Sequence, residues 1–168
     1  MNIAIELVKK EEKEILKNLM EKYNYELSQY DDRDVNHIGL YGYDYFDCYW
    51  TEEKRHPFFI KVNGKLAGFV MVNDYPDKKS IKTDYSIGEF FVLYKYRKFG
   101  IGKFTAKYIF NKFKGKWQLK ILPKNKISEI FWKNIINEYT NGNYKYFEND
   151  PEAVCDGGVL GHVFIFET

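Results

Sequence analysis

A strand, a glycine-bearing turn, a helix and a second strand follow one another in the middle of the chain, and this order constrains the fold more than any other feature. The run from Asp84 to Tyr94 is rich in residues that favour strands, and its Gly88 indicates a bulge or a close backbone approach. The turn contains Gly100 and Gly102, and an amphipathic helix and the strand WQLKILP follow it. Two strands joined by a helix are expected to lie parallel.

The rest of the chain adds mainly antiparallel strands. Asn63-Gly64 separates two apolar runs, and this dipeptide is a strong hairpin signal because both residues tolerate positive φ. An alternating N-terminal run precedes helical spacing over Lys9 to Tyr23, and YKYFEN and GHVFIFET near the end are typical of strands. No clear period is present from Asn24 to Glu53. These patterns predict an α+β (α/β) domain over residues 1–168, with a mixed, largely antiparallel sheet of about six to seven strands, flanking helices and the central parallel crossover.

Two of the expected helices have apolar faces that can be predicted from their spacing. The face of the helix after the glycine turn is expected to comprise Ile101, Phe104, Tyr108, Ile109 and Phe113. Asn125 or Ser128 can cap the next helix, and Asn141-Gly142 can end it. Its apolar face is expected to include Ile127, Ile130, Phe131, Ile135 and Tyr139.

The composition excludes several classes of protein. The net charge of only +2 lacks the basic excess of a dedicated nucleic-acid binder, and no apolar run approaches the roughly 18 residues that span a membrane. Cys48, Cys155 and the three histidines form no metal-ligand spacing, so we expect no metal site. The N-terminus lacks a signal-peptide pattern. We expect a cytoplasmic protein with no membrane partner, and the sequence is compatible with a homo-oligomer.

The glycine turn has the features of an anion site. The first N–H groups of a helix have no internal partner and carry partial positive charge. Here Arg97, Lys98 and Lys103 surround Gly100 and Gly102 and can add charge-assisted contacts. Two glycines at a helix start cost stability unless a ligand approaches closely, so a phosphate or pyrophosphate is the expected ligand. The alternative is a solvated, basic helix start.

Spacing distinguishes between the known phosphate-binding turns. The P-loop pattern fails because Arg97 and Phe104 replace its first glycine and its serine or threonine, and the dinucleotide fingerprint is incomplete because Thr105 replaces its third glycine. The run VLYKYRKFGIGK, Val92 to Lys103, instead resembles the R/Q-x-x-G-x-G/A signature of GCN5-related N-acetyltransferases, the GNAT superfamily. NKISEIFW, Asn125 to Trp132, is similar to a second motif of that family, with serine replacing alanine.

The resemblance implies an N-acetyltransferase with acetyl-coenzyme A as cosubstrate and no metal. In this family the turn amides bind the pyrophosphate, and exposed backbone groups of the preceding strand bind pantetheine. The implied cofactor contacts are Val92, Leu93, Arg97, Lys98, Phe99, Gly100, Ile101, Gly102, Lys103, Asn125 and Trp132. Asn125 can face coenzyme A, cap its helix, or do both.

The resemblance also implies direct attack of an amine on the thioester in a ternary complex. The Val92 N–H is the candidate to polarise the thioester carbonyl, and Glu89 is the best-placed carboxylate to take a proton, directly or through water. Glu89 can equally be a solvent-facing or ion-paired strand residue. Many members have a tyrosine that protonates the departing thiolate, where this chain has Trp132, which cannot act as an acid. Three tyrosines can substitute for it: Tyr139, Tyr144 and Tyr146.

The acceptor site is expected in the segment after the first helix, together with the last hairpin. The residues predicted there are Tyr43, Asp44, Tyr45 and Asp47. Aromatic faces beside carboxylates suit a cationic amine, but the same residues can form a packed wall with a solvated acidic rim. Small-molecule amines, peptide N-termini and protein lysines all fit. Two alternative functions are an acyl-coenzyme A-binding domain without activity and, less favoured, a nucleic-acid-binding module with lysines and aromatics interleaved between Tyr94 and Trp117.

Overall fold

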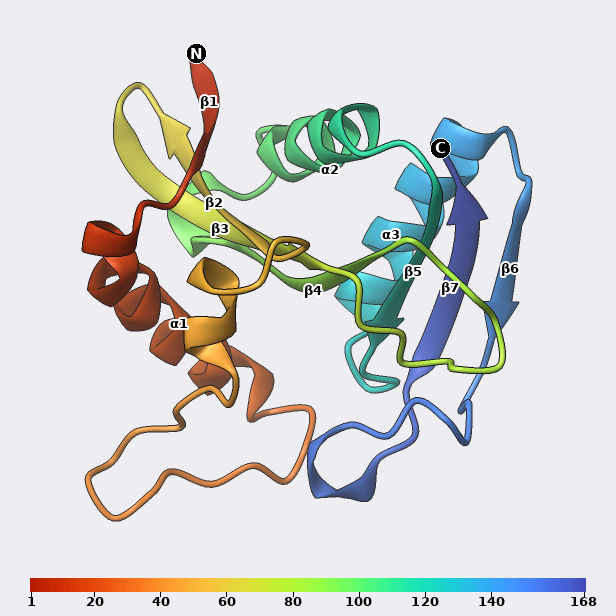
Figure 1. Ribbon diagram of the computed structural model, residues 1–168, viewed down its shortest axis with the longest axis horizontal. Helices are drawn as coiled ribbons and strands as arrows, with labels where there is room; N and C mark the ends of the chain where they lie inside the picture. Colours follow the sequence, from red (N-terminus) through yellow and green to blue (C-terminus); the bar gives the residue numbers. More distant parts are fainter.

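The computed structural model describes residues 1–168 as a mixed seven-stranded sheet flanked by three α-helices (Figure 1). The strands are β1 Ile3–Leu7, β2 His56–Val62, β3 Lys65–Asn73, β4 Tyr85–Val92, β5 Lys116–Ile121, β6 Tyr144–Phe147 and β7 His162–Glu167. The helices are α1 Lys13–Leu27, α2 Ile101–Lys112 and α3 Lys126–Thr140. Short 3₁₀ segments are η1 Lys10–Glu12, η2 Phe46–Trp50, η3 Tyr94–Tyr96 and η4 Asp156–Gly158.

The sheet has the order β1-β2-β3-β4-β5-β7-β6, and its only parallel pair is β4 with β5. The helix α2 connects these two strands, as the sequence predicts. Asn63 and Gly64 form the β2–β3 turn with φ values of 49° and 75°. The predicted fold class is therefore confirmed.

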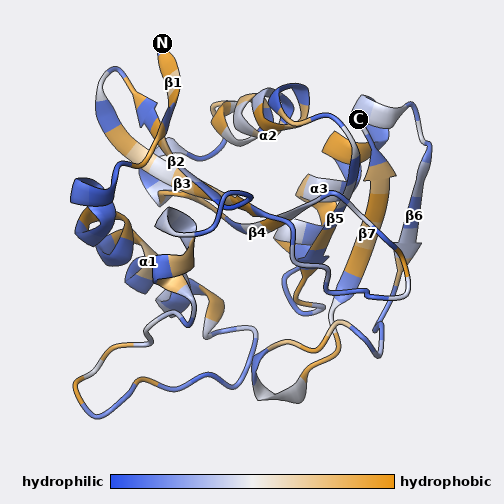
Figure 2. Ribbon diagram, in the orientation of Figure 1, coloured by the Kyte–Doolittle hydropathy of each residue, from blue (hydrophilic) through white to orange (hydrophobic).

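The sheet separates two apolar layers. On one face α2 and α3 pack on residues such as Phe58, Val70 and Trp117. On the other face α1 and η2 pack on the alternate residues, such as Phe59 and Phe69. Figure 2 shows apolar residues along β2 and β7 and largely hydrophilic residues in the long loop after α1. None of the helices combines the length and apolar character that crossing a membrane requires.

The strands β4 and β5 pair only at their beginnings. Tyr85 to Ile87 lie opposite Trp117 to Leu119, and no later residue of β4 pairs with β5. The β3–β4 register shifts at Gly88, which confirms a bulge there. A Cβ atom on Gly88 would lie 2.6 Å from Asn73 Nδ2 and 2.9 Å from the Tyr49 hydroxyl. Because β4 has no β5 partner beyond Ile87, the second half of β4 has an open side.

The predicted apolar faces of α2 and α3 are wrong in part. Phe104 is 46% exposed, whereas Thr105, Ala106 and Phe110 are buried. Thr105 was missed because it is polar, but its hydroxyl donates to Ile101 O at 2.9 Å and is satisfied within the helix. The exposed members of the predicted faces also include Tyr108, Ile127 and Ile130, and on α3 the buried residues include Trp132 and Ile136.

The first helix begins later than the spacing predicts. The predicted range is Lys9 to Tyr23, but α1 runs from Lys13 to Leu27 after the turn η1. Glu12 accepts a hydrogen bond from Lys9 N at 3.1 Å, which stabilises this turn in place of the first helical turn. As a result, Asn24 and Glu26 belong to the helix and face the open side of β4.

Candidate active site

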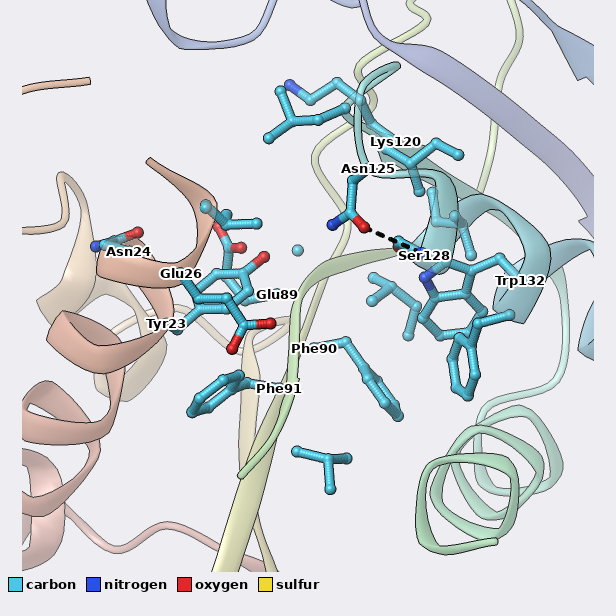
Figure 3. Close-up of a pocket in the computed structure, with 18 of the residues that line it drawn as sticks. Tyr23, Asn24, Glu26, Glu89, Phe90, Phe91, Lys120, Asn125, Ser128 and Trp132 are labelled. Atoms are coloured by element: carbon cyan, nitrogen blue, oxygen red, sulfur yellow. Dashed lines mark hydrogen bonds between the residues drawn. The ribbon is translucent and has the colours of Figure 1, made fainter. Parts of the chain in front are cut away.

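A cleft of about 1620 Å³ opens where β4 and β5 separate. Figure 3 shows its two walls, with Tyr23 and Glu26 of α1 on one side and Asn125 and Trp132 on the other. The second half of β4 runs between these walls. The volume exceeds the roughly 300–1,000 Å³ of typical small-ligand sites, so the cleft can hold two ligands side by side.

The turn before α2 forms one end of the cleft. The backbone N–H groups from Lys98 to Lys103 have no backbone acceptor within the chain, and the first bonded N–H is that of Phe104, which donates to Gly100 O at 2.9 Å. Lys98 and Gly100 have φ values of 66° and 77°, and such left-handed turns gather consecutive N–H groups into a concave anion site. All residues from 98 to 103 line the cleft. This end of the cleft can therefore bind an anion of pyrophosphate size.

Gly102 allows a close contact between this turn and α3. A Cβ atom on Gly102 would lie 3.0 and 3.1 Å from two ring carbons of Phe131. Phe131 packs on Phe90 of β4 and on Trp132, with ring centroids 5.7 and 4.9 Å apart. Ile101 is buried, so its side chain is not available to a ligand.

The three basic side chains of the turn have different partners. Arg97 donates to Val92 O at 2.7 Å and pairs with Glu26 at 2.6 Å, so it connects the end of β4 to α1. Lys103 pairs with Glu138 at 2.6 Å. Lys98 is exposed and has no carboxylate partner. Lys98 is therefore the one of the three whose charge is free for an incoming anion.

The end of β4 presents backbone groups to the cleft. Leu93 N donates to Ala67 O at 2.8 Å across the β3–β4 ladder. In an antiparallel pair the direction of backbone groups alternates, so the Val92 N–H points away from β3 toward the open side. Val92 lines the cleft there, whereas Leu93 packs beside the α1 core.

Glu89 lies on β4 at the centre of the cleft. Burial raises the pKa of its carboxyl to about 7, while hydrogen bonds from Tyr23 and Tyr43 and the charges of Arg33 and Lys120 act in the opposite direction. Burial and the nearby Glu89 raise the pKa of Tyr23 well above its usual value, so its hydroxyl stays protonated and can donate. A carboxyl with a pKa near 7 is suited to accept a proton at neutral pH.

Asn125 and Trp132 form the opposite wall. The Asn125 side-chain oxygen accepts a hydrogen bond from Ser128 N at 3.0 Å, drawn dashed in Figure 3, and caps α3. The same side chain lines the cleft, so capping leaves its NH₂ group available. Trp132 is 4% exposed and packs edge-on against Phe90 at 5.0 Å. Its ring is mainly part of the core.

We expect Asn125→Ala to lower the free energy of unfolding by about 1 kcal/mol, because the substitution removes the helix cap. Asn125→Asp is the matched control, since a carboxylate accepts the same hydrogen bond and should keep most of the stability. Urea denaturation measures both. Equal stability of Asn125→Ala and the parent protein would contradict the capping role.

The structure brings only part of the predicted acceptor set to the cleft. Tyr43 and Asp44 line it, but Tyr45 and Asp47 do not. Tyr45 has a φ of 61°, immediately precedes η2 and is 76% exposed, while Asp47 pairs with Lys13 of α1 at 2.8 Å. The predicted acid substitutes also lie outside the cleft: Tyr139, Tyr144 and Tyr146. Their neighbours explain this, because the Tyr139 and Tyr146 hydroxyls donate to Asn111 and Glu129.

The sequence patterns do not predict several residues of the cleft. Tyr23 has the helical spacing of a core residue, and nothing in the sequence connects it with Glu89. Arg33 lies in the segment without a clear period, yet its guanidinium pairs with Asp31 at 2.6 Å and donates to Asn24 at 2.7 Å. Only the three-dimensional fold reveals these contacts.

Known proteins agree with this architecture. The family model for the acetyltransferase (GNAT) family matches residues 14–135. An acetyltransferase of Streptococcus agalactiae has 16% identity and a TM-score of 0.69, with coverage of 99% of this chain and 95% of that one. An acetyltransferase of Thermus thermophilus has 11% identity and a TM-score of 0.68, with coverage of 100% and 98%.

A third similar structure contains ligands. Diaminobutyrate acetyltransferase from Paenibacillus lautus, solved with its substrate L-2,4-diaminobutyric acid and coenzyme A, has 14% identity and a TM-score of 0.65 over 99% of this chain and 95% of that one. No curated protein sequence matches the chain. Because the family model covers most of the sequence and the fold agrees, this chain belongs to the GNAT acetyltransferase family.

Proposed function

We propose that this protein transfers the acetyl group of acetyl-coenzyme A to an amine by direct attack within a ternary complex. One observation carries the proposal: a single cleft contains a run of unbonded backbone N–H groups at Lys98 to Lys103 and, further along β4, the Glu89 carboxyl with a pKa raised to about 7. The first feature suits a pyrophosphate and the second suits the removal of a proton from an ammonium group.

The backbone of β4 connects these two features. The residues from Glu89 to Val92 face the cleft without a β5 partner, so a pantetheine arm can lie beside them and form the hydrogen bonds that β5 does not supply. In this arrangement the Val92 N–H donates to the thioester oxygen and stabilises the negative charge that develops there. The Lys98 side chain and the turn N–H groups hold the pyrophosphate.

Glu89 is the proposed general base. A primary amine is mostly protonated near neutral pH and must lose a proton before it attacks. The deprotonated Glu89 carboxylate accepts that proton, directly or through a water molecule, and Tyr23 and Tyr43 fix its orientation. The departing thiolate belongs to a thiol with a pKa of about 8.5, so it is a tolerable leaving group without a strong acid nearby.

The test is a transfer assay with purified protein, acetyl-coenzyme A and a panel of amines, in which release of the coenzyme A thiol is measured. Saturable, amine-dependent release supports the proposal. Acetyl-coenzyme A binding without release by any amine would instead favour the alternative of a binding domain without activity. The absence of acetyl-coenzyme A binding at millimolar ligand would overturn both.

A further inference from the structure

The far end of the cleft, opposite the turn before α2, is bordered by two loops that meet. These are the loop of residues 28–45 after α1 and the loop of residues 148–161 between β6 and β7 (Figure 1). Arg33 of the first loop pairs with Asp156 of the second at 3.1 Å. The backbones also approach closely, because a Cβ atom on Gly157 would lie 3.0 Å from Asp32 Cβ.

Each loop is also fixed to the rest of the protein. In the first loop Arg33 donates to Asn24 of α1 at 2.7 Å, and its ion pair with the buried Asp31 at 2.6 Å orients its guanidinium within the loop. In the second loop Asp150 pairs with Lys78 at 2.8 Å, and Val154 O accepts from Lys120 at 3.2 Å. The anchors of both loops involve half-buried or buried groups, and such contacts contribute more to stability than exposed ion pairs do. These contacts hold the two loops together at this point, which restricts the access of a polypeptide to the cleft.

Charge is unevenly distributed along the cleft. The carboxylates that line it all lie outside the turn: Glu26, Asp34, Asp44, Asp77, Glu89 and Asp156. The two cations on that side are already paired, since Arg33 pairs with Asp156 and Lys120 pairs with Asp77. Asp34, Asp44 and Glu89 form no ion pair with these basic side chains, although the charges of Arg33 and Lys120 are felt at Glu89. The side of the cleft away from the turn is therefore net negative.

Aromatic rings add to the preference for cations on this side. Tyr23 and Tyr43 line the cleft beside the Glu89 carboxyl, and the faces of such rings attract ammonium groups. A ligand carboxylate placed here would meet like charges and no free basic side chain, which is unfavourable in a partly desolvated cleft.

We propose, on the basis of the transferase function above, that the acceptor is a compact, positively charged amine such as an aliphatic diamine. Polypeptides are disfavoured by the joined loops, and amines that carry a carboxylate are disfavoured by the unpaired acidic groups. The second ammonium group of a diamine lies among the carboxylates while the first approaches Glu89.

The first test compares 1,4-diaminobutane with 4-aminobutyrate, which also has four carbons but carries a carboxylate in place of one aminomethyl group. Calorimetry measures the binding of each to the protein saturated with coenzyme A. We expect the diamine to bind at least about 10-fold more tightly. Equal binding, or tighter binding of 4-aminobutyrate, would overturn the inference even if acetyl-coenzyme A turnover is observed.

The second test addresses the joined loops. We expect kcat/KM for acetyl transfer to 1,4-diaminobutane to exceed that for short lysine-containing or free N-terminal peptides by at least about 10-fold. Asp156→Asn removes the ion pair with Arg33 and should reduce the ratio of kcat/KM for the diamine to kcat/KM for peptides several-fold. Asp34→Asn is the matched control, because it removes one cleft carboxylate of the same charge but leaves the loops joined, and should not improve peptide transfer.

Two results would overturn the role of the joined loops. One is a kcat/KM for peptides equal to that for 1,4-diaminobutane in the parent protein, and the other is an equal gain in kcat/KM for peptides in both variants. Failure of the transferase function gives a different result. In that case acetyl-coenzyme A binds but no amine releases thiol, while the binding comparison still shows whether the cleft selects a diamine.

Discussion

Gly102→Glu is expected to weaken the binding of acetyl-coenzyme A by at least about 100-fold, equivalent to about 2.7 kcal/mol. Gly102 lies within the run of unbonded N–H groups, and its Cβ position is 3.0 Å from the ring of Phe131, so a glutamate there must displace Phe131 and brings a negative charge next to the turn amides. The added carboxylate would repel a pyrophosphate at short range and displace it from the turn amides. Calorimetric titration with acetyl-coenzyme A measures the loss.

Asn111→Glu is the control for this experiment. It introduces the same charge on the exposed side of the same helix, nine residues further along, which is about 13.5 Å at 1.5 Å per residue. A glutamate there can still accept the hydrogen bond that Tyr139 donates to Asn111. The control should bind acetyl-coenzyme A as the parent protein does. If folded Gly102→Glu also binds within about threefold of the parent, the turn is not the pyrophosphate site.

The residues around Gly102 show why a sequence can reveal this half of the cleft. The N–H groups of a turn are contiguous in sequence, so the spacing of Arg97, Gly100 and Gly102 describes nearly all of the local geometry. The side-chain directions were less predictable. Arg97 was expected to face an anion, but it pairs with Glu26 because α1 continues beyond its predicted end.

The acceptor half of the cleft depends on contacts between distant segments. Glu89 was selected from its position before Val92, but its partners Tyr23 and Tyr43 come from α1 and the following loop. Burial by these segments is what changes its pKa, and no local pattern carries that information. The ion pair between Arg33 and Asp156 likewise connects two loops, and no sequence pattern in either loop indicates this contact.

The same limit explains the errors in the helix faces. Periodicity weights large apolar residues, so it placed Phe104 and Ile130 in the core. The sheet instead receives α2 through Thr105 and Ala106, whose small side chains fit beneath the helix, and α3 through Trp132. Because the surroundings of Glu89 also depend on distant segments, its predicted role as a base is the part of the site that most needs an experiment.

Glu89→Gln is expected to lower kcat by about 10²–10³-fold while leaving acetyl-coenzyme A binding intact, because the amide keeps the shape but cannot take a proton. In the parent protein kcat should rise with pH and level off above an apparent pKa of about 7, since the deprotonated carboxylate is the active form. The variant should lose this ionisation. Glu89→Asp retains a carboxylate and should keep part of the activity.

Stability measurements distinguish the loss of kcat from the unfolding of the variant. The pKa of Glu89 is raised from 4.5 to about 7 in the folded protein, so the folded state holds its proton more tightly than the unfolded state. The stabilising contribution of this proton is complete below pH 4.5 and is lost as the pH rises through about 7. A neutral glutamine has no such loss, so Glu89→Gln should be at least as stable as the parent at pH 8 in thermal denaturation. A folded Glu89→Gln variant that keeps more than a tenth of the parental kcat would show that another group takes the proton, and Glu89 would then be only a partly buried strand residue.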